Sequence, residues 1–80
     1  MQASTVLAAI ATAMAPYIGK TMAQSSTTLH SRKVGIDQTI DSGQFEELLR
    51  RLALGLNIFI GRDKTTALVD QIRSGVENLR

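Results

Sequence analysis

The side chains suited to acid, base or nucleophilic chemistry lie between residues 30 and 47. His30 is the only histidine, Ser31 follows it, and Asp37 lies in the next polar segment. A serine beside a histidine needs a third group that orients the base, and the spacing does not provide one. Glu46 and Glu47 are adjacent, so on a helix they point about 100° apart and cannot face each other as a catalytic pair. We therefore expect no catalytic residues and no enzyme activity.

A second chemical motif is Gly19-Lys20-Thr21, which matches the end of a phosphate-binding loop. The first glycine of such a loop would have to stand at position 14, which is Met14, and no strand precedes it. The sequence therefore predicts no nucleotide site, and no cofactor is expected.

The segment before residue 45 can be compared with a calcium loop that leads into its exit helix. In that register the first ligand would be Lys33, the turn glycine would be Gln38, and the bidentate glutamate would be Gln44. Calcium lacks its oxygen ligands in this arrangement. Asp41 followed by Gln44 is instead typical of a helix capping box, so we predict a helix start and no metal site.

Start and stop signals divide the chain into helices. Pro16 disfavours helix in the residue before it, and Gly61 suits a helix end. Asp63 is placed to cap the last helix. The predicted elements are a helix over 5–15, a bend at Pro16, a helix over 16–29, a loop over 31–41, and helices over 42–60 and 63–79. The last two should form an antiparallel hairpin on the Ala-rich N-terminal helix, which predicts an all-α fold with three to four short helices in one domain, residues 1–80.

Two of these helices have more apolar surface than a chain of 80 residues readily covers. In the helix over 42–60, Leu54 and Ile58 lie opposite the core stripe, and the helix over 5–15 is apolar or small on nearly every side. The simplest solution is a twofold dimer that completes the core. The residues predicted for this interface are Val6, Ile10, Met14, Leu54 and Ile58.

Composition narrows the setting of the protein. There is no cysteine, which favours a reducing compartment, and we expect the cytoplasm. The longest stretch of low charge, Val6 to Gly19, is too short to cross a bilayer, so we expect no membrane partner. The net charge of only +2 gives little electrostatic reason for nucleic-acid binding.

The sequence therefore predicts a non-catalytic helical interaction or adaptor protein, which forms a homodimer or docks a partner helix through apolar faces. The alternative is a small nucleic-acid-binding or regulatory protein. A helix-turn-helix around Gly61 fits poorly, because Asn57, Arg62 and Asp70 occupy positions that need small or apolar residues. The cations assigned to phosphate binding in this alternative are Arg50, Arg51, Arg62, Lys64 and Arg73.

Overall fold

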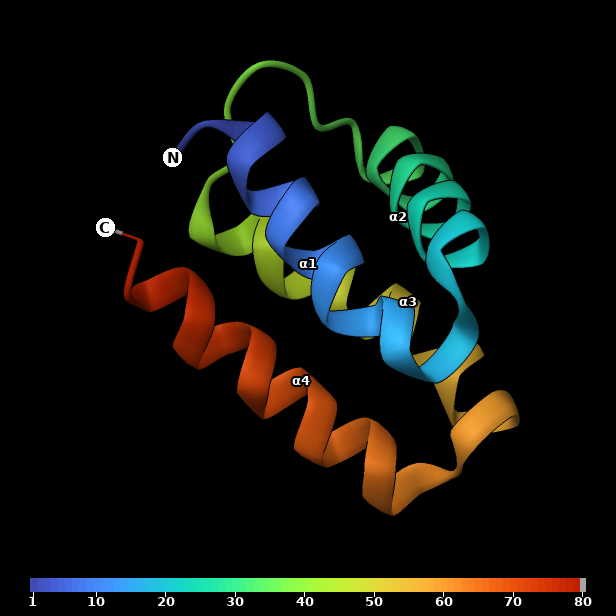
Figure 1. The fold of residues 1–80 in the computed structure, drawn as a ribbon. Coiled ribbons are helices and arrows are strands. Elements are labelled where there is room, and N and C mark those ends of the chain that lie inside the picture. Colours follow the sequence, from blue (N-terminus) through green and yellow to red (C-terminus); the bar gives the residue numbers. More distant parts are fainter. Residues whose placement is uncertain (80) are drawn as a thin grey trace.

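The computed structural model describes residues 1–79, and four helices make up 84% of them, with no strand in this range. The helices are α1 (Ala3–Ile18), α2 (Lys20–Val34), α3 (Ser42–Ile60) and α4 (Arg62–Glu77). Helix α1 packs against α2 and α4, and α3 packs against the same two helices (Figure 1). The prediction of an all-α fold is confirmed.

The core is one cluster of buried apolar side chains that all four helices share. Helix α1 contributes Val6, Ile10 and Met14, each at most 1% exposed, so the prediction that these three face another molecule is wrong for the described chain. The exposed positions of α1 carry small or polar side chains apart from Pro16 and Tyr17, and Tyr17 is 44% exposed. The N-terminal helix therefore needs no second copy to cover it.

The break between the first two helices lies at Gly19, and the predicted bend at Pro16 is wrong. Pro16 lies in the last turn of α1, where its missing N–H removes only one hydrogen bond of the helix. Gly19 has φ 87°, and its N–H donates to the carbonyl of Ala15 at 2.8 Å. Glycine adopts this conformation without a steric penalty, so the chain turns there.

Helix α2 ends at Val34, three residues beyond the start of the predicted loop. Its buried hydroxyls bond to carbonyls of the same helix: Thr27 Oγ1 donates to Ala23 at 2.7 Å, and Ser31 Oγ donates to Thr28 at 2.8 Å. These bonds allow a polar segment to remain helical while one side of it is buried. The connection to α3 is therefore residues 35–41.

This connection is tied to the start of the chain. The N–H of Ala3 donates to Gln38 and the N–H of Ile40 donates to Met1, both at 3.0 Å, on either side of an isolated bridge between Gln2 and Thr39. Ile40 is 1% exposed and joins the core. The segment is a pinned loop with a single bridge.

The predicted start of α3 is confirmed in detail. The N–H of Gln44 donates to Asp41 Oδ1 at 2.7 Å, and the Gln44 side chain accepts from the N–H of Asp41 at 3.1 Å. The predicted cap of α4 is wrong, because Gly61 takes the N-cap position with φ 84° and Asp63 lies in the first turn. There the carboxylate of Asp63 still meets the positive end of the helix dipole.

The capping box gives a first stability prediction. Asp41→Ala should lower the free energy of unfolding by about 1 kcal/mol, because the N–H of Gln44 loses its acceptor. Urea denaturation followed by circular dichroism measures the change. Asp37→Ala is the matched control in the same loop, and an equal loss in that variant would show that the cap is not the cause.

Candidate docking surface between helices 2 and 3

The residues considered for catalysis do not assemble into a reactive site. Ser31 is buried and its hydroxyl donates to the carbonyl of Thr28, while Asp37 lies exposed in the loop. Residues 1–79 contain no cluster of three or more histidine, aspartate or glutamate side chains that could hold a metal ion. The hydroxyl of Ser31 thus serves the helix that carries it.

Glu47 lies between two arginines of its own helix. Glu47 Oε1 lies 2.6 Å from Arg50 Nη2 and 3.1 Å from Arg51 Nε. The hydrogen bond from Arg50 is the main reason that the pKa of Glu47 lies below its ordinary value. Both arginines are therefore partly neutralised, which weakens the nucleic-acid alternative.

Arg73 links α4 to α3. Its guanidinium lies 2.6 Å from Glu46 of α3 and 3.3 Å from Asp70 on its own helix, and the bond to Glu46 lowers the pKa of that carboxyl. Arg73 and Arg50 line one shallow groove together with Glu46 and Glu47, so the groove has mixed charge. Such a groove gives phosphates no consistently positive path. Arg62 and Lys64 lie apart from it, exposed in the first turn of α4.

The candidate functional surface is a set of exposed large apolar side chains on α2 and α3. We call the following five side chains the α2–α3 face: Met22 (40% exposed), Leu29 (50%), Leu54 (61%), Ile58 (85%) and Phe59 (60%). The prediction that Leu54 and Ile58 lie outside the core is met. A folded monomer gains nothing from leaving large apolar side chains in water, and a group of them marks an interaction surface.

A small hollow joins the two helices beneath this face. It measures about 40 Å³ and is lined on α2 by Met22, Ser26 and His30, and on α3 by Gly55 and Phe59. Of the exposed apolar side chains, Met22 and Phe59 line this hollow, which also borders the buried side chains of Met14, Leu52 and Leu56.

Gly55 has no structural reason to be glycine within the described chain. It lies in the middle of α3 without a positive φ, and a Cβ added to it would meet no atom of residues 1–79 within 4 Å. Glycine inside a helix costs about 1 kcal/mol relative to alanine. Alanine at this position should therefore stabilise α3.

His30 lies at the edge of the same hollow. Helix α2 continues past it to Val34, and the His30 side chain is partly buried. Its Nδ1 is buried and has no hydrogen-bond partner in the part of the chain that the structure describes. Burial lowers the pKa of His30 below its ordinary 6.5, and the charges of Lys33 and Arg51 lower it further.

This shift predicts a loss of stability in mild acid. The unfolded chain binds a proton at His30 near pH 6.5, whereas the folded chain binds it only at a lower pH. The stability present above pH 6.5 is therefore lost as the pH falls through the lower pKa of the folded state. Melting temperatures between about pH 7.5 and pH 5.5 should fall less steeply in His30→Gln than in the wild type. Parallel curves would contradict the assignment. Glu46 and Glu47 titrate below this window, because their pKa values lie under 4.5.

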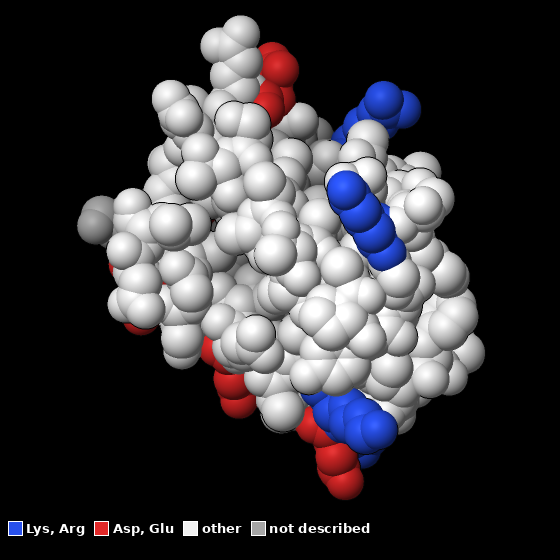
Figure 2. All heavy atoms as spheres, in the orientation of Figure 1, with Lys and Arg blue, Asp and Glu red and all other residues white. Residues whose placement is uncertain are grey.

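A broader groove lies between α1 and α2, with a volume of about 550 Å³. Alanines and threonines line most of it, and Lys20 and Gln24 stand at its side. Figure 2 shows this part of the surface as a largely uncharged face, with lysines and arginines on the α2 side. Small side chains leave little apolar area to bury, so the α2–α3 face is the stronger candidate.

Comparisons with known proteins add no assignment: no family model, no curated protein and no solved structure matches this chain. None of the helices within residues 1–79 is long and apolar enough to cross a membrane.

Proposed function

We propose that this chain is a non-catalytic interaction module that docks a helix on the α2–α3 face. The observation that carries the proposal is the exposure of Leu54, Ile58 and Phe59 on α3, beside Met22 and Leu29 on α2, while the core of the single chain is already filled. Two neighbouring helices with exposed apolar side chains suit an amphipathic helix, whose apolar side chains recur at the same spacing. In keeping with the lack of cysteine, we place the module in the cytoplasm.

The energies of burial are adequate for this role. Fully burying an exposed aliphatic or aromatic side chain contributes about 1.5–3 kcal/mol. The five side chains of the face are 40–85% exposed, so each can contribute part of this amount. Association itself costs several kcal/mol in lost freedom, so the net affinity of one groove for one helix should be modest. Affinities in the micromolar range are typical of such a balance.

A second copy of the chain is the occupant that the sequence predicts. A dimer was predicted mainly because it would complete the core, yet Val6, Ile10 and Met14 are buried within one chain. Of the residues predicted for the interface, Leu54 and Ile58 are exposed and so can contact another molecule. A dimer through the α2–α3 face is therefore one form of the proposed function, and docking of another protein is the other.

Nucleic-acid binding receives less support. Arg50, Arg51 and Arg73 are each bonded to a glutamate, and the net charge is +2. Phosphate contacts would have to displace these carboxylates. We therefore propose the helix-docking function ahead of it.

A designed probe helix tests the proposed function. The probe has about 18 residues, with leucines at helical spacing on one face and glutamines on both flanks. We expect fluorescence anisotropy to detect its binding to the wild type, with a dissociation constant of about 100 μM or tighter. Ile58→Ser should weaken it, because the most exposed apolar side chain is lost.

Leu79→Ser is the matched control, since Leu79 is 53% exposed at the other end of the molecule. If the wild type does not bind the probe at all, or if both variants weaken it equally, the α2–α3 face is not a docking surface. Light scattering of the wild type alone identifies the second copy as the occupant if it gives the mass of a dimer.

A further inference from the structure

Helix α2 is the element of the bundle that is held least firmly. Its buried side chains are those of Ala23, Thr27 and Ser31, and its larger apolar side chains are only partly buried or are exposed. The other three helices each bury several large aliphatic side chains. Because apolar stabilisation scales with the area removed from water, the docking of α2 is the weakest in the bundle.

No polar interaction compensates for this small buried area. The buried hydroxyls of α2 donate to carbonyls of α2 itself. Within residues 1–79, no hydrogen bond or ion pair joins α2 to another helix, whereas Arg73 of α4 bonds to Glu46 of α3. An isolated helix of 15 residues rich in serine and threonine is marginal in water. Loss of docking and loss of helix should therefore occur together in α2.

Both ends of α2 are glycines with positive φ. Gly19 has φ 87° and Gly35 has φ 85°, and a Cβ added to either would meet no atom of residues 1–79 within 4 Å. Hinge motions are absorbed by a few residues at the ends of an element, and glycine changes φ and ψ with little steric cost. Figure 1 shows α2 on the side of the bundle away from α4. It can therefore move without separating α4 from α1 and α3.

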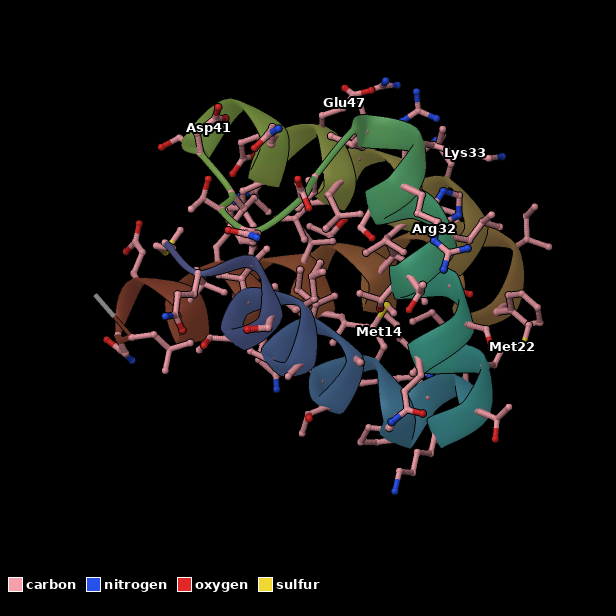
Figure 3. The ribbon with its side chains drawn as sticks, turned by 90° about the horizontal axis from the view of Figure 1, so that it is seen from above. Met14, Met22, Arg32, Lys33, Asp41 and Glu47 are labelled. Atoms are coloured by element: carbon pink, nitrogen blue, oxygen red, sulfur yellow. The ribbon has the colours of Figure 1, made fainter. Side chains whose placement is uncertain are left out.

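Helix α2 covers apolar side chains of two other helices. The small hollow beneath it is lined by Met14 of α1 and by Leu52 and Leu56 of α3, which are 0–4% exposed. Figure 3 shows Met22 near the start of α2 and Met14 in the interior of the bundle. Movement of α2 away from α1 and α3 exposes an apolar surface that the closed structure hides.

His30 favours this movement in mild acid. Its Nδ1 is buried and has no hydrogen-bond partner among the described residues. Both nitrogens of a protonated imidazole are donors, so Nδ1 becomes a buried donor without an acceptor. The charges that act on it are Lys33 of α2 and Arg51 of α3, and Arg51 is bonded to Glu47. Helix α1 brings only apolar side chains to the hollow, so His30 binds its proton more readily once α2 has moved away.

We infer that α2 is an acid-sensitive cover, which undocks from α1 and α3 as one unit while α1, α3 and α4 stay packed. The two terminal glycines act as its hinges, and protonation of His30 favours the open form. A proton that binds one form more tightly shifts the equilibrium toward that form. Docking of a helix on the α2–α3 face of the closed form does not require this motion.

Native-state hydrogen exchange of the wild type measures the opening of each helix. At about pH 7.5 the amides of α2 should be at least tenfold less protected than the buried amides of α1, α3 and α4, because protection follows the free energy of local opening. At about pH 5.5 the protection of α2 should fall several-fold further, and His30→Gln should remove this fall.

Two buried threonines provide a matched pair for a second measurement. Thr27 of α2 is 2% exposed, Thr65 of α4 is 3% exposed, and the chain has no cysteine. In the single-cysteine variants Thr27→Cys and Thr65→Cys, a thiol reagent reacts only when the helix opens. We expect Thr27→Cys to react about tenfold faster than Thr65→Cys, each rate being taken relative to that of the same variant unfolded in urea.

The outcomes separate the motion from its trigger. Equal protection of all four helices in the wild type, or equal relative rates for the two cysteine variants, overturns the undocking of α2. If α2 opens to the same extent at both pH values, or if its fall in protection persists in His30→Gln, the role of His30 is overturned. Neither measurement depends on the probe helix, so failure of the cover and failure of the docking surface are distinguishable.

Discussion

Replacing Ile10 by glutamate should unfold the chain. Ile10 is fully buried at the centre of α1, between Val6 and Met14, in the cluster that joins all four helices. Even Ile10→Ala should cost about 2–5 kcal/mol, because a cavity replaces the side chain. A domain of this size has only about 3–5 kcal/mol of stability from its core, so a buried, unpaired carboxylate exceeds the whole margin. Far-ultraviolet circular dichroism should show the loss of helix.

Thr12→Glu is the control for this experiment, because Thr12 lies exposed on the same helix. It should keep the native helix content and nearly the native melting temperature. The sequence predicted that Ile10 lies in a dimer interface, and in that case Ile10→Glu should stay folded and become monomeric. A folded, monomeric Ile10→Glu from a dimeric wild type would restore Ile10 to the interface.

Local signals predicted the second half of the fold well. The start of α3 depends on Asp41 and Gln44, three residues apart, and both bonds of the capping box form. Its end depends on Gly61, whose positive φ stops the helix as expected. Such signals act within a few residues, so they can be read without knowledge of the tertiary structure.

In the first half of the chain, local signals alone did not decide where the helices end. Pro16 and Gly19 are both helix breakers, and only the packing of α2 against α1 decides that the chain turns at Gly19. The polar stretch before Val34 was predicted to leave the helix, yet Thr27 and Ser31 bond to carbonyls of the helix and remain buried. Hydroxyl side chains permit both outcomes, so the sequence does not decide between them.

The candidate surface was also predicted only in part. Helical spacing placed Leu54 and Ile58 opposite the core stripe, and both are exposed. The same spacing cannot say which other helix covers a face, and for that reason Ile10 was misplaced. Met22 and Leu29 were missed, although two large apolar side chains seven positions apart in a polar segment are a signal for one exposed stripe.

Leu54→Glu and Ile58→Glu should leave the fold intact and remove its capacity for docking. The two side chains are 61% and 85% exposed, so their replacement should change the free energy of unfolding by no more than about 0.5 kcal/mol. Each replacement removes an apolar contact of up to about 1.5–3 kcal/mol, which corresponds to roughly tenfold to a hundredfold weaker binding of the probe helix.

Chemical denaturation and probe binding measured on the same samples separate the two effects. Leu79→Glu, a charge placed on an exposed leucine outside the face, should preserve both stability and binding. If Ile58→Glu unfolds the chain, the exposed position of Ile58 on α3 is wrong. If the variant is stable and still binds the probe like the wild type, the helix docks elsewhere, and the α1–α2 groove beside Lys20 becomes the surface to test.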